Sequence, residues 1–464
     1  MGTTAVKTQT ENRAHIAAWP QTSAPLIPNW RLWGIRLSFS LVGPGAAVSA
    51  GLLVNLLLAR WLPPQQYGSF VLVFAVFLFL AGIHNALLLE PMSVLGPADY
   101  QRSLADYFEA QIWVHLAFSA VLATPLLFAA ALLALFGFGG SLPGALLGAG
   151  LALPFILLLW LARGMCRVLE RPVSAMPGSV CNLVLLLGGL LALQATHKTT
   201  LFRVFLLLGF AGLCAALLIF HKLQIGLDET RPCSVNWLSA AAENWRYGRW
   251  LLGGAVCSVS LGQTPVLLTP VFLGLAATGK MFAMQIPALL MLECSAAAAM
   301  FLLPSFVRES LTGSSDRLRQ LAHRLSRSLA GASLLFAALL YLTAAPLERL
   351  LFGGKFAGDA WLMPLFMLIP LFAGLASGYS LALRMHRPHF ELLANGIAAA
   401  VSLQTAFLFI PLWGLAGAAI SMASGFAVHA AVVYLCFRQA AANDHREFAS
   451  QSRGEITPLD QFNV

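Results

Sequence analysis

The chain carries little charge for its size. Of its 464 residues only 10% are charged, with 19 acidic residues against 28 lysines and arginines, whereas 59% are hydrophobic. With a mean hydropathy of +0.78, so much apolar surface cannot be enclosed in one soluble core. The composition therefore excludes an ordinary soluble enzyme and places most of the chain in a lipid bilayer.

Sequence motifs of several catalytic and binding classes are also missing. There is no glycine-rich phosphate loop, no cluster with metal-ligand spacing, and no sizeable polar region for a Ser/His/Asp or Cys/His set. We therefore expect no catalytic residue, metal or cofactor, and without a basic soluble module we expect no nucleic-acid partner. The seven cysteines form no CxxC pair, and we interpret them as free, small apolar fillers: Cys166, Cys181, Cys214, Cys233, Cys257, Cys294 and Cys436.

Long apolar runs are abundant. About 20 helical residues cross the roughly 30 Å hydrocarbon core of a bilayer. The sequence has twelve runs of this order, which predict an all-α polytopic membrane protein with about 12 transmembrane helices: 36–58, 69–89, 112–136, 143–162, 176–194, 201–220, 250–273, 281–306, 328–345, 360–382, 390–410 and 413–437. The polar ends, residues 1–30 and 439–464, are interpreted as a disordered cytoplasmic leader and a cytoplasmic tail.

The basic residues predict the orientation of the chain. With the N-terminus in the cytoplasm, 22 lysines and arginines fall on the inner side and six on the outer side. Because inner loops of membrane proteins are enriched in these residues, both termini are predicted to be cytoplasmic. The net charge of +9 is then a topology signal and an attraction to anionic lipids.

The longest polar connection, residues 221–249, follows the sixth run and divides the chain into two halves. We expect a six-helix lobe at 31–220, a cytoplasmic linker at 221–249 and a second six-helix lobe at 250–438. Six spans in each half make the lobes parallel repeats about an axis along the membrane normal. A faint echo supports this: Gly68 and Gly279 occupy corresponding outer turns.

Three short motifs carry a family resemblance. Residues 62–70 fit the pattern Leu-x-Pro-x-x-Tyr-Gly-x-Phe, the eighth run ends in FLLPSFVRE at 301–309, and the last two runs meet at IPLWGLAGAAIS, 410–421. In this order and topology the motifs resemble the polysaccharide transporter family, which includes O-antigen flippases. That family belongs to the multidrug, oligosaccharidyl-lipid and polysaccharide exporter superfamily.

The resemblance implies a substrate and a location. A member of that family moves a polyprenyl-diphosphate-linked oligosaccharide from the cytoplasmic to the periplasmic leaflet of a bacterial inner membrane, for lipopolysaccharide or exopolysaccharide assembly. Membrane lipids and a polysaccharide polymerase would be its partners. Two alternatives stay open: a cation-coupled multidrug antiporter and a non-transporting scaffold of a polysaccharide synthase complex.

Polar residues inside the spans are the candidates for a substrate or coupling cavity. Glu293 lies about thirteen residues into its run, where an ionised carboxylate costs roughly 2.5–3.5 kcal/mol. We expect it to face a wet cavity and either to couple transport to protons or cations or to accept bonds from sugar hydroxyls, although a neutral glutamate bonded to another helix would also fit. The other candidates, each of which could instead join neighbouring helices, are His84, Asn85, Asn55, Gln263 and Gln285.

Basic and proline residues suggest two further roles. Arg163 and Arg167 end the fourth run, and Arg319 and Arg324 lie in 309–327, where Leu311, Leu318, Leu321 and Leu325 form one stripe typical of an interfacial helix. These four arginines are candidate diphosphate contacts at the inner mouth, with ordinary positive-inside anchoring as the alternative. The candidate hinge residues, which could equally be static kinks, are Pro265, Pro270 and Pro287.

The topology is directly testable. Cysteines introduced singly at Lys198 and Lys355 should react with a membrane-impermeant thiol reagent from the periplasmic side, and those at Arg171 and Arg319 only after the inner face is exposed. Because all four sites are predicted to be extramembranous, each should react from one side only. The opposite sidedness at any two of them would contradict the orientation.

Overall fold

The computed structural model describes residues 50–137, 139–224, 235–311, 315–387 and 389–452. Every regular element in these ranges is helical, and ten of the helices are long and apolar enough to cross a membrane. The predicted all-α polytopic membrane fold is confirmed. Only the second part of the first expected span falls within the described residues, where it lies in the apolar helix Ala50–Trp61. The last two expected spans lie together in one long helix, the tenth of these candidates, at His389–Ala440.

The elements follow one another in a simple order. They are α3 (Pro64–His84), the π-helix η1 (Asn85–Leu89), α4 (Glu90–Asp99), α5 (Leu104–Leu135), α6 (Leu142–Val168), η2 (Pro172–Ala175), α7 (Met176–Ala195), α8 (Leu201–Leu223), α9 (Trp237–Leu273), α10 (Leu275–Leu311), α11 (Ser315–Phe352), η3 (Ala357–Asp359), α12 (Leu362–Phe366), α13 (Leu368–His386) and α14 (His389–Ser452).

A glycine separates the two spans contained in α14. Gly414 has φ 58° and ψ −130°, which is not helical and which residues with a Cβ rarely adopt. Three residues later, a Cβ on Gly417 would collide with the Phe409 carbonyl. Two spans therefore meet here without a loop, as the WGLAG segment predicts.

Three segments differ from the sequence-based expectation. Residues 237–249, expected as linker, form the first turns of α9. No separate interfacial helix occupies the described part of 309–327, because α11 runs from Ser315 into its span and buries Leu318 and Leu325 in a cluster with Tyr379 of α13. The stripe is thus protein core. In the tail, α14 continues to Ser452, while residues 1–30 lie outside the described residues.

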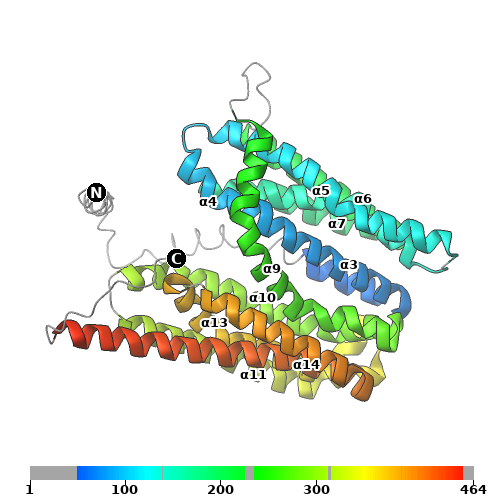
Figure 1. The fold of residues 1–464 in the computed structure, drawn as a ribbon. Coiled ribbons are helices and arrows are strands. Elements are labelled where there is room, and N and C mark those ends of the chain that lie inside the picture. Colours follow the sequence, from blue (N-terminus) through cyan, green and yellow to red (C-terminus); the bar gives the residue numbers. More distant parts are fainter. Residues whose placement is uncertain (1–49, 138, 225–234, 312–314, 388, 453–464) are drawn as a thin grey trace, which may run out of the picture.

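The helices form two groups with α9 between them (Figure 1). The N-lobe comprises helix Ala50–Trp61 through α8, and the C-lobe comprises α9 through α14. The groups converge where α3 and α10 begin and spread apart towards the other end, where α9 begins (Figure 1). We call the spread end, which carries the turns 100–103 and 169–175, the basic end, and the convergent end the opposite end.

Two glycines seal the opposite end. A Cβ on Gly68 of α3 would collide with the Leu275 carbonyl of α10, and a Cβ on Gly279 of α10 would collide with the Pro64 carbonyl of α3. The backbones of the two lobes therefore touch at the positions that the sequence pairs as equivalent turns. Beside them, the buried ring of Tyr67 meets Phe282 at 6.5 Å between centroids.

This contact predicts the effect of one methyl group. Gly68→Ala should separate the lobes at the opposite end, because overpacking costs about 1–3 kcal/mol, a roughly five- to hundredfold shift in the equilibrium. A reporter cysteine at the buried Thr278, in a background without other cysteines, should then react faster with a thiol reagent. Gly262→Ala, which meets nothing within 4 Å, is the matched control. Equal Thr278→Cys reactivity in both variants would refute the seal.

Candidate substrate path between the lobes

Polar contacts reinforce the seal at the opposite end. Arg60 of the N-lobe donates from Nη1 to the Leu350 carbonyl at 2.8 Å. Lys355 of the C-lobe donates from Nζ to the carbonyls of Arg60 and of Leu62, the latter at 3.0 Å. Burial, and then the Arg60 charge, lower the pKa of Lys355. All three bonds are accepted by backbone carbonyl oxygens. Because an opening of the lobes would expose these oxygens to water, water could replace the lost donors, and breaking the bonds would cost little free energy.

Helix α9 packs along the N-lobe in the middle of the molecule. A Cβ on Gly82 of α3 would lie 2.8 Å from Val259 Cγ2, and one on Gly248 of α9 would lie 2.5 Å from the Ala86 carbonyl. Gly82 of α3 and Phe282 of α10 therefore lie on the surfaces through which the two lobes face each other, as do the two glycines of the seal. Side chains in helical register with these residues line the space between the lobes.

Three of the predicted cavity residues are in this register. Gln263 is one turn beyond Val259 on α9, and Asn85 follows Gly82 by three residues. Glu293 follows Phe282 by 293 − 282 = 11 residues on α10, which is about three turns, and its side chain is exposed in the isolated protein. This register is compatible with the predicted position of the three side chains between the lobes.

The other three predicted cavity residues are packed inside the protein. Asn55 donates to the Gly51 carbonyl at 2.9 Å and accepts from Tyr67 Oη at 3.4 Å. His84 is fully buried against His115, with 2.9 Å between ring nitrogens. Gln285 is buried, and its Oε1 has no partner among the described residues. These side chains are buried in contact with protein where we had expected a cavity.

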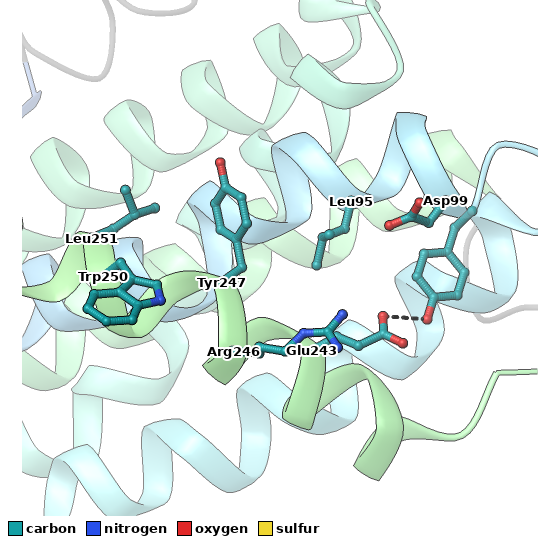
Figure 2. A pocket seen from close by; sticks show the side chains of 8 residues that line it. Leu95, Asp99, Glu243, Arg246, Tyr247, Trp250 and Leu251 are labelled. Atoms are coloured by element: carbon teal, nitrogen blue, oxygen red, sulfur yellow. Dashed lines mark hydrogen bonds between the residues drawn. The ribbon is translucent and has the colours of Figure 1, made fainter. Parts of the chain in front are cut away.

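A pocket of about 640 Å³ opens at the basic end (Figure 2). One wall is the end of α4 with the following Tyr100, and the other is the beginning of α9. Its lining combines aromatic, acidic and basic side chains: Leu95, Asp99, Tyr100, Glu243, Arg246, Tyr247, Trp250 and Leu251. Rings beside carboxylates can stack on a sugar and accept bonds from its hydroxyls, or hold an organic cation.

One hydrogen bond joins the two walls of this pocket. Tyr100 donates from Oη to Glu243 Oε2 at 2.7 Å (Figure 2). Burial, and then this bond, raise the pKa of Tyr100 to about 12, so the phenol keeps its proton at neutral pH. Asp99 and Arg246 remain exposed to a ligand.

A buried amide pair fastens the start of α9 to the N-lobe. Asn244 donates to Gln111 Oε1 at 2.8 Å, and Gln111 donates back to Asn244 Oδ1 at 3.3 Å. Tyr107 Oη lies 3.5 Å from the same oxygen. The interpretation of 237–249 as linker missed these residues, although the Asn236 that caps α9 by accepting from the Leu238 amide at 2.9 Å was a readable helix-start signal.

The candidate diphosphate ligands occupy two places. On α6, the Nε and Nη2 atoms of Arg163 are buried and have no partner among the described residues. Arg167 Nη2 would lie 3.8 Å from a Cβ on Gly164, whose other neighbours are Met92 and Leu89, so it is close to α4. Arg319 and Arg324 project from the exposed side of α11. The first pair is on α6, which packs against α4 through Gly164 and Met92, and neither arginine of that pair lines the pocket.

The predicted hinge prolines sit in uninterrupted helices. Helix α9 continues through Pro265 and Pro270, and α10 continues through Pro287. Pro265 has no N–H for the Leu261 carbonyl, and Ser402 of α14 lies 3.4 Å from that oxygen. The bend that sequence reasoning missed is η1, where the Glu90 amide bonds to the Asn85 carbonyl just before Pro91. No metal-holding group of three His, Cys, Asp or Glu side chains was found in the described ranges.

Comparisons with known proteins address the fold. No family model and no curated protein matches the sequence. Among solved structures, the chain is similar to a multidrug resistance MATE family transporter of the MOP superfamily in an inward-facing conformation (TM-score 0.68, 14% identity, 87% of this chain and 98% of that one). It is equally similar to the lipid II flippase MurJ in an inward-closed conformation (TM-score 0.68, 12% identity, 90% and 93%).

An outward-facing MATE transporter of the MOP superfamily is less similar, with a TM-score of 0.60, 16% identity and coverage of 88% and 94%. At these identities the likeness is one of fold. The chain thus has the multi-pass fold of MOP-superfamily transporters, and its similar structures are transporters and a flippase.

The assignment of Glu293 to a water-filled space is testable. A cysteine at Glu293 should react with a charged, water-soluble thiol reagent, because thiolates form only where water reaches. Leu335 of α11, 74% exposed in the bare protein, is the matched control, since its cysteine would face lipid and stay unreactive. Equal inertness of both sites in membranes would place Glu293 against lipid.

Proposed function

We propose that the protein is a flippase of a bacterial inner membrane. It moves a polyprenyl-diphosphate-linked oligosaccharide from the cytoplasmic to the periplasmic leaflet for surface or exopolysaccharide biosynthesis. The two lobes, joined by the connection between α8 and α9, rock between forms open to the two sides. Both termini and the basic end face the cytoplasm. The polymerase that extends the exported glycan is its expected partner.

The observation that carries this proposal is that two atoms of the Arg163 guanidinium, Nε and Nη2, are buried and have no hydrogen-bond partner among the described residues. Buried N–H groups of a cation that lack partners are costly in a membrane protein. Arg167, one turn further along α6, adds a second positive charge. A diphosphate is the ligand that two neighbouring arginines bind best, because its oxygens accept bidentate hydrogen bonds.

The pocket at the basic end fits the glycan part of such a substrate. One wall of the pocket is the end of α4, and α4 also packs against α6, which carries the two arginines, so we expect the sugar and the diphosphate to bind on either side of α4. Tyr247 and Trp250 offer rings for stacking, and Asp99 offers a carboxylate for sugar hydroxyls. From there Asn85, Gln263 and Glu293 would continue the polar path, while the lipid tail stays in the bilayer.

The sealed opposite end and spread basic end fit the inward-facing step of alternating access. Export would require the contacts of Gly68 and Gly279 to part after the substrate has bound.

Proteoliposomes with a fluorescent polyprenyl-diphosphate oligosaccharide test the function. The wild type should move the lipid to the far leaflet. Arg163→Gln with Arg167→Gln should reduce the rate tenfold or more, because each lost charge-assisted bond costs about 1.5–3 kcal/mol. Arg102→Gln, an exposed arginine at the same end, should stay within twofold. Absent wild-type transport, or equal rates in all variants, would contradict the proposal.

A second candidate is export of organic cations, and the carboxylates of the pocket favour it. Asp99 and Glu243 outnumber Arg246, and their aromatic neighbours could hold a cation. The same proteoliposomes with a pH gradient and a fluorescent cation such as ethidium separate the two functions. Cation export that is lost in Asp99→Asn, without lipid transport, would favour the second candidate.

A further inference from the structure

Two buried histidines form a hydrogen-bonded chain inside the N-lobe. His84 Nε2 of α3 lies 2.9 Å from His115 Nδ1 of α5, and His115 Nε2 lies 3.1 Å from the Pro154 carbonyl of α6. Both side chains are fully buried. The two rings stand nearly perpendicular, at 89°, with centroids 5.1 Å apart.

The chain of bonds fixes where the protons lie. A carbonyl oxygen only accepts, so His115 Nε2 must carry a hydrogen, and in the neutral ring Nδ1 is then the acceptor. His84 therefore donates from Nε2, which leaves its Nδ1 as a bare acceptor. That atom is buried and has no partner among the described residues.

Few charged or titratable groups lie near His84 in the described structure. On its own helix the neighbouring carboxylate, Glu90, accepts from Asn85 at 3.2 Å. From α5 the ring of Phe118 stacks on His84 at 6.3 Å, and α6 contributes the Pro154 carbonyl. His115 is the titratable partner whose charge would oppose a second charge on the pair, and α9 meets this stretch through the uncharged Gly248 and Val259.

The pair adjoins the one irregular turn of its span. His84 is directly followed by the π-helical segment Asn85–Leu89. Pro91 explains this turn, because its ring would clash with the Leu87 carbonyl in an α-helix and it donates no N–H. A π-turn holds one residue more than an α-turn, so a change in its hydrogen bonding would rotate the residues on one side relative to the other and re-aim His84.

We propose that the His84–His115 pair binds one proton at His84 Nδ1 and that η1 rearranges when it does. A proton from water forms a new N–H bond there and returns to water on release. In the present arrangement the new N–H would have no acceptor, which costs the full desolvation of a charged donor. The structure is therefore the proton-free form, and proton binding favours the form open at the opposite end.

The inference that proton binding drives glycan export rests on the proposed function. Proton uptake by the histidine pair does not depend on that function. Lower pH should increase the reactivity of Thr278→Cys at the opposite end. We expect a fivefold or greater rise between pH 8 and pH 5.5, relative to a cysteine at the exposed Lys198, which corrects for the reagent's own pH dependence.

The matched variants isolate the pair. His84→Gln can still donate to His115 but cannot take the proton, so Thr278→Cys should lose its pH response. His323→Gln removes a histidine bonded to Tyr379 in the other lobe and should keep it. A pH response in His84→Gln equal to that of the wild type would overturn the proposal.

A second measurement uses the unmutated histidines. In protein labelled with ¹⁵N-histidine, His84 Nδ1 should pass from the bare to the protonated chemical-shift range as pH falls. A bare Nδ1 down to pH 5 would refute the site even if glycan transport is intact. Proton uptake without glycan transport would instead contradict only the proposed function.

Discussion

Backbone contact between Gly68 and Gly279 is the constraint on which the rest of the structure depends. Each glycine brings a carbonyl of the other lobe so close that no side chain fits between them. In a bilayer, where lipid tails compete with apolar packing, such close approach is a main source of helix association. The contact holds α3 against α10 at one end, and the lobes can diverge only towards the other end.

Polar groups mark both ends of the space between the lobes. The sealed end has the bonds from Arg60 and Lys355 to carbonyl oxygens, and the basic end has the pocket of Asp99 and Trp250. The proposed path joins them through Gln263 and Glu293. The arginines beside α4 favour an anionic lipid-linked substrate, and the two pocket carboxylates are the opposing evidence.

The sequence predicts much of this fold because span length and glycine turns are local. The all-α membrane fold and the turn at Gly414 were readable, and the two glycines that the sequence pairs, Gly68 and Gly279, prove to be in contact. The sequence was a weaker guide to the site: Asn85, Gln263 and Glu293 share the helical register of the interlobe contacts, whereas Asn55 and the buried His84 are hydrogen-bonded within the N-lobe. The partner of His84, His115, lies on another helix, and no local pattern identifies such a contact. Pro91 was a visible signal for the π-turn, and Asn236 for the early start of α9.

The most direct test of the account is a pair of interlobe distances measured by double electron–electron resonance in lipid nanodiscs. Spin labels at the exposed Arg102 and Arg324 report on the basic end, and labels at Lys198 and Gly358 report on the opposite end. On addition of a polyprenyl-diphosphate oligosaccharide, the account predicts a shorter distance at the basic end and a longer one at the opposite end. Distances that stay fixed, or that change in the same direction at both ends, would contradict it.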